Sequence, residues 1–127
     1  MSNKSSRHHI GVDIVEISQI EYAISRWGNA FLRRIYTANE IRVYGNSVSS
    51  LAARFAAKEA VIKAFSCQID NINYKDIEIL SDDIGIPYVQ LHGAALEKSR
   101  EVGIVDFAVS LSHAKETAIA FVITNTN

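Results

Sequence analysis

Four charged side chains interrupt an otherwise apolar stretch, residues 51–65, and they are of the types that bind phosphates or a metal: Arg54, Lys58, Glu59 and Lys63. Glu59 and Lys63 are four residues apart, so on a helix they point the same way from adjacent turns. As a solvated surface pair they would add only a few tenths of a kcal/mol. The stretch has little free surface, so its charges need partners, and the phosphates of a cofactor would supply them. The spacing alone favours the surface pair, and the lack of free surface favours the functional interpretation.

A further carboxylate, Asp13, lies between Val12 and Ile14 in the run IGVDIVEI. The β-branched residues of this run predict a strand, in which Asp is unusual. A buried carboxylate is costly unless it is paired or bound to a metal. The alternative is that Asp13 faces solvent on an edge strand. Gly11, two residues earlier, permits a close approach to the backbone.

A long helix must position the central charges. Residues 51–65 contain six alanines among fifteen residues and no Gly or Pro, which predicts a helix. Ser47, Ser49 and Ser50 offer oxygens to cap its first turn. Bulky apolar residues share one side of this helix and alanines gather on the opposite side, so we expect it to be buried on two sides. Asp13 and Glu59 can meet only if the helix lies against the strand.

The other elements follow from periodicity and from helix and turn signals. Thr37 and Glu40 form a capping-box pattern that opens a short helix, and Ser18 is a candidate cap for an earlier one. We expect strands over 10–17, 77–80, 87–91, 107–112 and 117–123, and helices over 20–27, 30–36, 38–44, 51–65 and 94–101. The fold class is therefore α+β, with an antiparallel sheet packed against a long central helix.

Length and composition limit the classes of protein. The 127 residues suit one domain, expected at 10–127 after a flexible tail at 1–9 that does not resemble a signal peptide. With 13 basic and 14 acidic residues, no bulk attraction to nucleic acid or to a membrane is expected. The single cysteine, Cys67, suits a reducing compartment, and no apolar run is long enough to span a membrane. We expect a cytoplasmic protein.

Several arginines make the segment after the first strand locally basic: Arg26, Arg33, Arg34 and Arg42. They are either ordinary surface charge or a docking patch for an acidic protein partner.

Three blocks of the sequence resemble the holo-acyl-carrier-protein synthase family of 4′-phosphopantetheinyl transferases: IGVDIVEI, RFAAKEAVIKAF and SLSHAKETAIAFV. The segments TANE and DDIGIPYV add to the likeness, which covers nearly the whole chain in order. The resemblance implies the 4′-phosphopantetheinyl transferase fold. It also implies transfer of 4′-phosphopantetheine from coenzyme A to a serine of apo-acyl carrier protein, in fatty acid biosynthesis, with 3′,5′-ADP as the second product.

By this resemblance, Asp13 and Glu59 match the carboxylates that hold magnesium against the pyrophosphate of coenzyme A. The chemistry agrees, because magnesium prefers oxygen ligands and commonly takes one or two carboxylates plus substrate phosphates. Glu59, directly or through a magnesium-bound water, is then the expected acceptor of the serine proton.

The resemblance also assigns the basic residues. Lys63 matches a lysine near the phosphates, Arg54 and Lys58 match positions that line the nucleotide pocket, and His113 matches a histidine near the nucleotide. Members of the family commonly form trimers whose active sites are shared between subunits, so we expect a homotrimer.

Two departures bear on binding. Gln19 stands where the family usually has an arginine that contacts the carrier protein, and Ser66-Cys67-Gln68 replaces a glycine-rich turn beside the nucleotide. The metal site is touched by neither. Two other classes of protein share these features: a non-catalytic coenzyme A-binding module that kept the fold, and a structural, carrier-docking partner within a larger synthase.

Overall fold

The computed structural model describes residues 7–65 and 72–127 of the chain. In chain order the elements are β1 (Arg7–Glu16), α1 (Ile17–Trp27), α2 (Asn29–Ile35), α3 (Ala38–Tyr44), α4 (Val48–Ala64), the 3-10 helix η1 (Tyr74–Asp76), β2 (Ile77–Ser81), β3 (Pro87–Leu91), α5 (Gly93–Val102), β4 (Ile104–His113) and β5 (Thr117–Thr126). This is the expected α+β fold. The turn Ser66-Cys67-Gln68, which differs from the glycine-rich turn of the family, lies outside the described residues.

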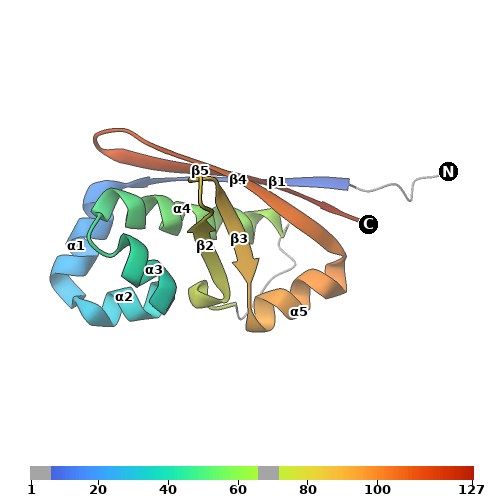
Figure 1. Ribbon diagram of the computed structural model, residues 1–127, viewed down its shortest axis with the longest axis horizontal. Coiled ribbons are helices and arrows are strands. Elements are labelled where there is room, and N and C mark those ends of the chain that lie inside the picture. Colours follow the sequence, from blue (N-terminus) through green and yellow to red (C-terminus); the bar gives the residue numbers. More distant parts are fainter. Residues whose placement is uncertain (1–6, 66–71) are drawn as a thin grey trace.

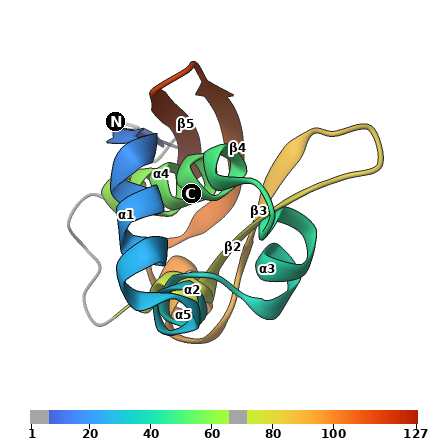
Figure 2. The ribbon, with the colours of Figure 1, turned by 90° about the vertical axis from the view of Figure 1, so that its left-hand side faces the viewer.

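The helix α4 lies between two layers (Figures 1 and 2). Above it in Figure 1 are the long strands β1, β5 and β4, below it are the short helices α2, α3 and α5, and the β2–β3 hairpin passes beside it. Both the bulky and the alanine sides of α4 are buried: Leu51, Ala56, Ala57, Ala60 and Val61 have no exposed surface. The prediction of a helix buried on two sides is confirmed.

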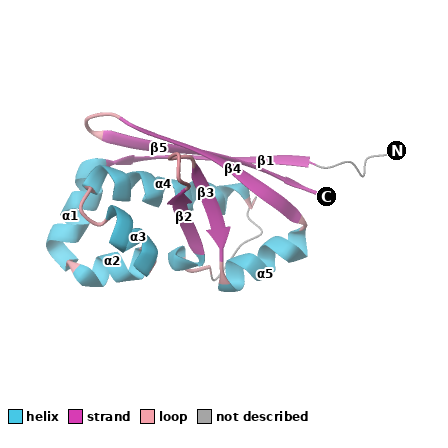
Figure 3. Ribbon diagram, viewed as in Figure 1, coloured by secondary structure: helices cyan, strands magenta, loops and turns pink. Residues whose placement is uncertain are grey.

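The strands divide between two antiparallel sheets, although the sequence was expected to form one (Figure 3). The three-stranded sheet has the order β1-β5-β4, and β2 pairs only with β3 in the other. Gly11 of β1 explains how closely α4 approaches the first sheet, because a Cβ atom at this position would lie 1.8 Å from the carbonyl oxygen of Ala60. The helix therefore lies against the strand that carries Asp13.

Local signals set most of the boundaries. Ser47 caps α4 through a 3.2 Å hydrogen bond from the backbone N–H of Ser50. The strand β1 begins at Arg7, so residues 7–9 belong to it and not to the expected tail. The cap expected at Ser18 is wrong, because α1 begins at Ile17 after Glu16 and has no side-chain cap.

The capping box of α3 continues into a buried polar network. Thr37 accepts a 3.1 Å hydrogen bond from the Glu40 N–H, and Glu40 accepts one of 2.9 Å from the Thr37 N–H and one of 2.7 Å from the N–H of Ile79. The Thr37 hydroxyl also donates to Glu78 at 2.6 Å, and His92 lies 3.0 Å from the other oxygen of Glu78. Burial raises the pKa of Glu78, but these hydrogen bonds outweigh it and leave the pKa below its usual value. The network joins α3 to β2.

The outer face of the three-stranded sheet, on the side away from α4, is apolar and exposed. We define the outer sheet face by five residues that are 39–63% exposed: Ile10, Val12, Ile14, Ile119 and Phe121. Large apolar surfaces of this kind commonly mark interaction sites. In the part of the chain that the structure describes, no helix is long and apolar enough to cross a membrane.

Candidate active site

Asp13 points from β1 toward α4, on the same face of the sheet as the buried Val15. Its side chain is only 18% exposed, although β1 is an edge strand, so it does not simply face solvent. The Nζ of Lys63 lies 3.0 Å from its Oδ1 and donates a second 3.0 Å hydrogen bond to the carbonyl of Val12. Lys63 itself is about half exposed. The strand carboxylate therefore has a cation beside it that is open to a ligand.

Glu59 faces the same region from α4. It accepts a 2.5 Å hydrogen bond from the hydroxyl of Tyr74, the first residue of η1. The pKa of this hydroxyl is raised to about 12 by burial, by its hydrogen bond to Glu59 and by the negative charges of Glu59 and Asp13. Lys63, whose ammonium lies 3.0 Å from Asp13, is one turn beyond Glu59 on α4, so both carboxylates lie beside the same part of this helix. Lys63 pairs with Asp13, and the described residues include no Glu59–Lys63 ion pair.

The donor set fits magnesium better than a softer metal. In the described ranges, 7–65 and 72–127, no group of three or more His, Cys, Asp or Glu side chains could enclose an ion. Zinc sites normally need three or four such ligands, whereas magnesium is commonly held by one or two carboxylates and completes its shell with waters and substrate phosphates. Asp13 and Glu59 supply that number of carboxylates, on a rigid strand and a rigid helix.

Arg54 lies on a different side of α4. It precedes Glu59 by five residues, which places the two about 140° apart around the helix. Its guanidinium lies 3.6 Å from the centre of the Tyr44 ring and donates a 3.1 Å hydrogen bond to Ser81. Among the described residues its buried Nε has no hydrogen-bond partner. Arg54 borders a hollow of about 250 Å³ between the β2–β3 hairpin and β4, where Pro87 and Leu111 are also found.

Lys58 is placed in the core, which corrects the expectation that it lines a nucleotide pocket. Its side chain has no exposed surface. The ammonium lies 2.8 Å from Glu40 and donates hydrogen bonds to the carbonyls of Tyr74 at 3.0 Å and Ile77 at 2.5 Å. Burial lowers the pKa of Lys58, an effect that the charge of Glu40 opposes. Sequence spacing did not reveal this role, because the partner residues lie far away in the chain.

His113 ends β4 and is exposed. In the sheet register Leu111 lies opposite Ala120, which lies opposite Asp13. His113 is therefore two strands and two residues away from Asp13, on the order of 12 Å. Within one chain the structure brings together Asp13, Glu59 and Lys63, but it does not bring Arg54 or His113 into that cluster.

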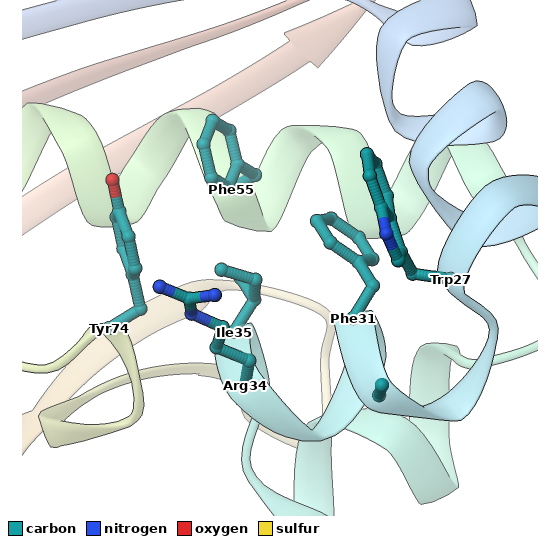
Figure 4. A pocket seen from close by; sticks show the side chains of 7 residues that line it. Trp27, Phe31, Arg34, Ile35, Phe55 and Tyr74 are labelled. Atoms are coloured by element: carbon teal, nitrogen blue, oxygen red, sulfur yellow. The ribbon is translucent and has the colours of Figure 1, made fainter.

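An apolar hollow of about 420 Å³ lies beside Tyr74 and was not predicted from the sequence. Figure 4 shows Trp27, Phe31, Phe55 and Tyr74 around it, with the guanidinium of Arg34 at its edge, directed toward Tyr74. Tyr74 separates this hollow from Glu59, to which it is hydrogen-bonded. No local pattern in the sequence marks Tyr74, because its position depends on the fold of distant segments.

Comparison with known proteins shows likeness over most of the chain. A sequence model of the 4′-phosphopantetheinyl transferase superfamily matches residues 9–122. The holo-[acyl-carrier-protein] synthase of Dehalococcoides mccartyi is 50% identical over 115 residues, which cover 91% of this chain and 96% of the relative. The enzyme of the same name from Herpetosiphon aurantiacus is 44% identical over 120 residues, covering 89% and 94%.

Solved structures agree with the sequence relatives. The crystal structure of Helicobacter pylori holo-[acyl-carrier-protein] synthase in complex with coenzyme A has a TM-score of 0.82 and 34% identity, covering 91% of this chain and 98% of that one. The ACPS–CoA complex of Chronobacterium ammoniagenes has a TM-score of 0.85 and 32% identity, covering 95% and 98%.

Proposed function

This chain belongs to the 4′-phosphopantetheinyl transferase superfamily, and from that premise we propose that Asp13 and Glu59 hold a magnesium ion that assists its reaction. The resemblance of the sequence blocks to holo-acyl-carrier-protein synthases is confirmed. The enzyme transfers 4′-phosphopantetheine from coenzyme A to a serine of apo-acyl carrier protein, giving the holo-carrier and 3′,5′-ADP. The observation that supports the metal proposal is geometric: Asp13 pairs at 3.0 Å with Lys63, and Glu59 lies one turn before Lys63 on the same helix.

The proposed chemistry assigns a role to each charged group. The serine hydroxyl attacks the pantetheine-bearing phosphorus of the coenzyme A diphosphate, and a new P–O bond forms. The bond from this phosphorus to the bridging oxygen breaks, and 3′,5′-ADP leaves with the electron pair. Glu59 accepts the serine proton, and Lys63 binds the phosphate oxygens with its half-exposed ammonium. When bound, magnesium would neutralise charge on the phosphate oxygens.

Replacing Asp13 by Asn tests the metal proposal, because it keeps the side-chain volume and removes the charge. The protein is incubated with apo-carrier, coenzyme A and magnesium, and the carrier is weighed by mass spectrometry. We expect the rate to fall by roughly a hundredfold or more with an unchanged fold. Asp106→Asn, at an exposed position of β4, is the matched control. Near-normal, metal-dependent transfer by Asp13→Asn would place the metal elsewhere.

The same assay separates the other classes of protein. A carrier that gains the mass of phosphopantetheine identifies a transferase. Binding of coenzyme A without this gain would identify a non-catalytic module, and neither result would identify a structural partner. Chelation of the metal should abolish the gain in the wild-type protein, and added magnesium or manganese should restore it.

We also propose a homotrimer with shared active sites. The outer sheet face supplies an apolar surface that a second copy would cover. The distance of Arg54 and His113 from the Asp13 cluster is explained if a neighbouring copy supplies the nucleotide-binding residues. Light scattering should give three times the 14.1 kDa of one chain. Phe121→Glu, on the outer sheet face, should shift the mass to one chain, whereas Val43→Glu, at a more exposed apolar position on α3, should not.

The carrier protein is proposed to dock beside the apolar hollow. Arg34 lies at the edge of this hollow, and Arg33 adjoins a second one with Arg42 and Lys75. Such a surface is complementary to an acidic protein with a few apolar side chains. We place the enzyme in the cytoplasm, which suits its single cysteine. Its family suggests a role in fatty acid biosynthesis.

A further inference from the structure

Tyr74 contacts α4 at two points that lie one turn apart. Its ring packs against Phe55, with the ring centroids 5.5 Å apart and the planes inclined by 35°. Its hydroxyl donates to Oε2 of Glu59 at 2.5 Å. Phe55 and Glu59 are separated by four residues, so they lie on the same side of the helix. Figure 4 shows the ring of Tyr74 standing beside α4 with its hydroxyl directed toward the helix.

The backbone of Tyr74 is held by the same helix. Lys58, the residue before Glu59, donates a 3.0 Å hydrogen bond to the Tyr74 carbonyl. The other two contacts of this buried ammonium are with Glu40 and with the carbonyl of Ile77, so all three of its donors are used. Tyr74 is therefore fixed at its carbonyl, its ring and its hydroxyl.

We propose that Tyr74 is a positioning residue for Glu59. A glutamate side chain rotates freely about its last bond and offers two equivalent oxygens. The hydrogen bond from Tyr74 occupies Oε2 and fixes the plane of the carboxylate, so that Oε1 faces the site beside Asp13, where Glu59 would hold the metal and accept the serine proton. This inference rests on the proposed role of Glu59. Outer-shell groups that orient metal ligands typically contribute 10–100-fold to metal affinity or activity.

The variant Tyr74→Phe isolates the hydroxyl, because it keeps the ring that packs on Phe55 and the backbone that Lys58 holds. Tyr88→Phe, which removes a hydroxyl from the half-exposed surface of β3, is the matched control. Two measurements are made on each protein. Mn²⁺ alone is titrated into the enzyme, with free Mn²⁺ followed by electron paramagnetic resonance, and kcat and the carrier KM are measured with magnesium.

For Tyr74→Phe we expect about tenfold weaker Mn²⁺ binding and about tenfold lower kcat, with carrier KM within roughly twofold of wild type. Tyr88→Phe should match wild type in all three quantities. Mn²⁺ affinity and kcat within twofold of wild type would overturn the inference, as would a lower melting temperature as the sole change.

The outcome is distinguishable from a failure of the proposed metal site. If Asp13→Asn abolishes Mn²⁺ binding and transfer but Tyr74→Phe leaves both unchanged, only the role of Tyr74 is wrong. If Asp13→Asn binds Mn²⁺ and transfers normally, the metal assignment itself is wrong, and the positioning role falls with it.

Discussion

Replacing Lys58 by Met should destabilise the fold strongly, although Lys58 belongs to the sequence block that marks the enzyme family. Methionine matches the length of the lysine stem but removes the charge and the three donors. Glu40 would then keep a buried negative charge without its cation, and the carbonyls of Tyr74 and Ile77 would each lose a donor. An unpaired buried charge and unsatisfied buried carbonyls both cost stability.

The magnitude follows from the contacts that remain. Removing one partner of a buried ion pair typically costs about 3–5 kcal/mol. Glu40 retains backbone hydrogen bonds from Thr37 and Ile79, which offset part of that cost. We therefore expect a loss of about 3 kcal/mol in the free energy of unfolding. A domain of this kind has roughly 5–15 kcal/mol in total, so the variant should fold but unfold at clearly lower urea concentration.

Urea titrations of Lys58→Met, Glu40→Gln and the double variant measure the coupling between the two residues. Glu40→Gln should cost less in the Lys58→Met variant than in the wild type, because the lysine that needs a negative partner is already gone. A loss below about 1 kcal/mol for Lys58→Met, or single losses that add within about 0.5 kcal/mol, would refute the buried pair.

Three further predictions concern exposed or titrating groups. Lys63→Ala should lower turnover at least about tenfold without changing the melting temperature, and unchanged kinetics would make Lys63 an ordinary surface cation. Replacing Arg33 and Arg34 by Glu should raise the KM for the carrier more than the KM for coenzyme A, and the carrier KM of the wild type should rise with salt. Equal effects on the two KM values would contradict docking at these arginines. The carboxyl of Glu78 has a lower pKa in the folded protein than the value of about 4.5 that it has when unfolded, so its negative charge stabilises the fold at pH values above 4.5. This stabilisation is lost as the pH falls below 4.5 and the carboxyl is protonated. In urea titrations, Glu78→Gln should therefore lose less free energy of unfolding than the wild type between pH 6 and pH 3.

Local signals in the sequence were sufficient for most elements. The capping box at Thr37 and Glu40 and the serine cap at Ser47 set helix starts, because short side chains there accept backbone hydrogen bonds within a few residues. The contact of α4 with the strand that carries Asp13 also followed, because a helix with two apolar sides had to lie against the sheet. Gly11 permits that contact, and the sequence indicated only that something approaches there.

Residues whose partners lie far along the chain were not predicted. Glu40 was explained by its helix cap alone, yet the fold adds Lys58 and the N–H of Ile79 to its partners. Tyr74 was not identified, since its hydroxyl reaches Glu59 only after η1 has folded against α4. The division into two sheets was missed because strand periodicity gives no information about which strands pair.

Two consecutive residues of α4 connect the buried core with the proposed site. Side chains of neighbouring residues on a helix point about 100° apart, so Lys58 can enter the core while Glu59 faces the site. Lys58 holds the carbonyl of Tyr74, and the hydroxyl of Tyr74 holds Glu59. The carboxylate of Glu59, which is proposed to bind the metal, is thereby connected through Tyr74 to the buried ion pair of Lys58 and Glu40. If Glu59 has the proposed role, charge in the core of this fold serves the geometry of the site as well as the stability of the chain.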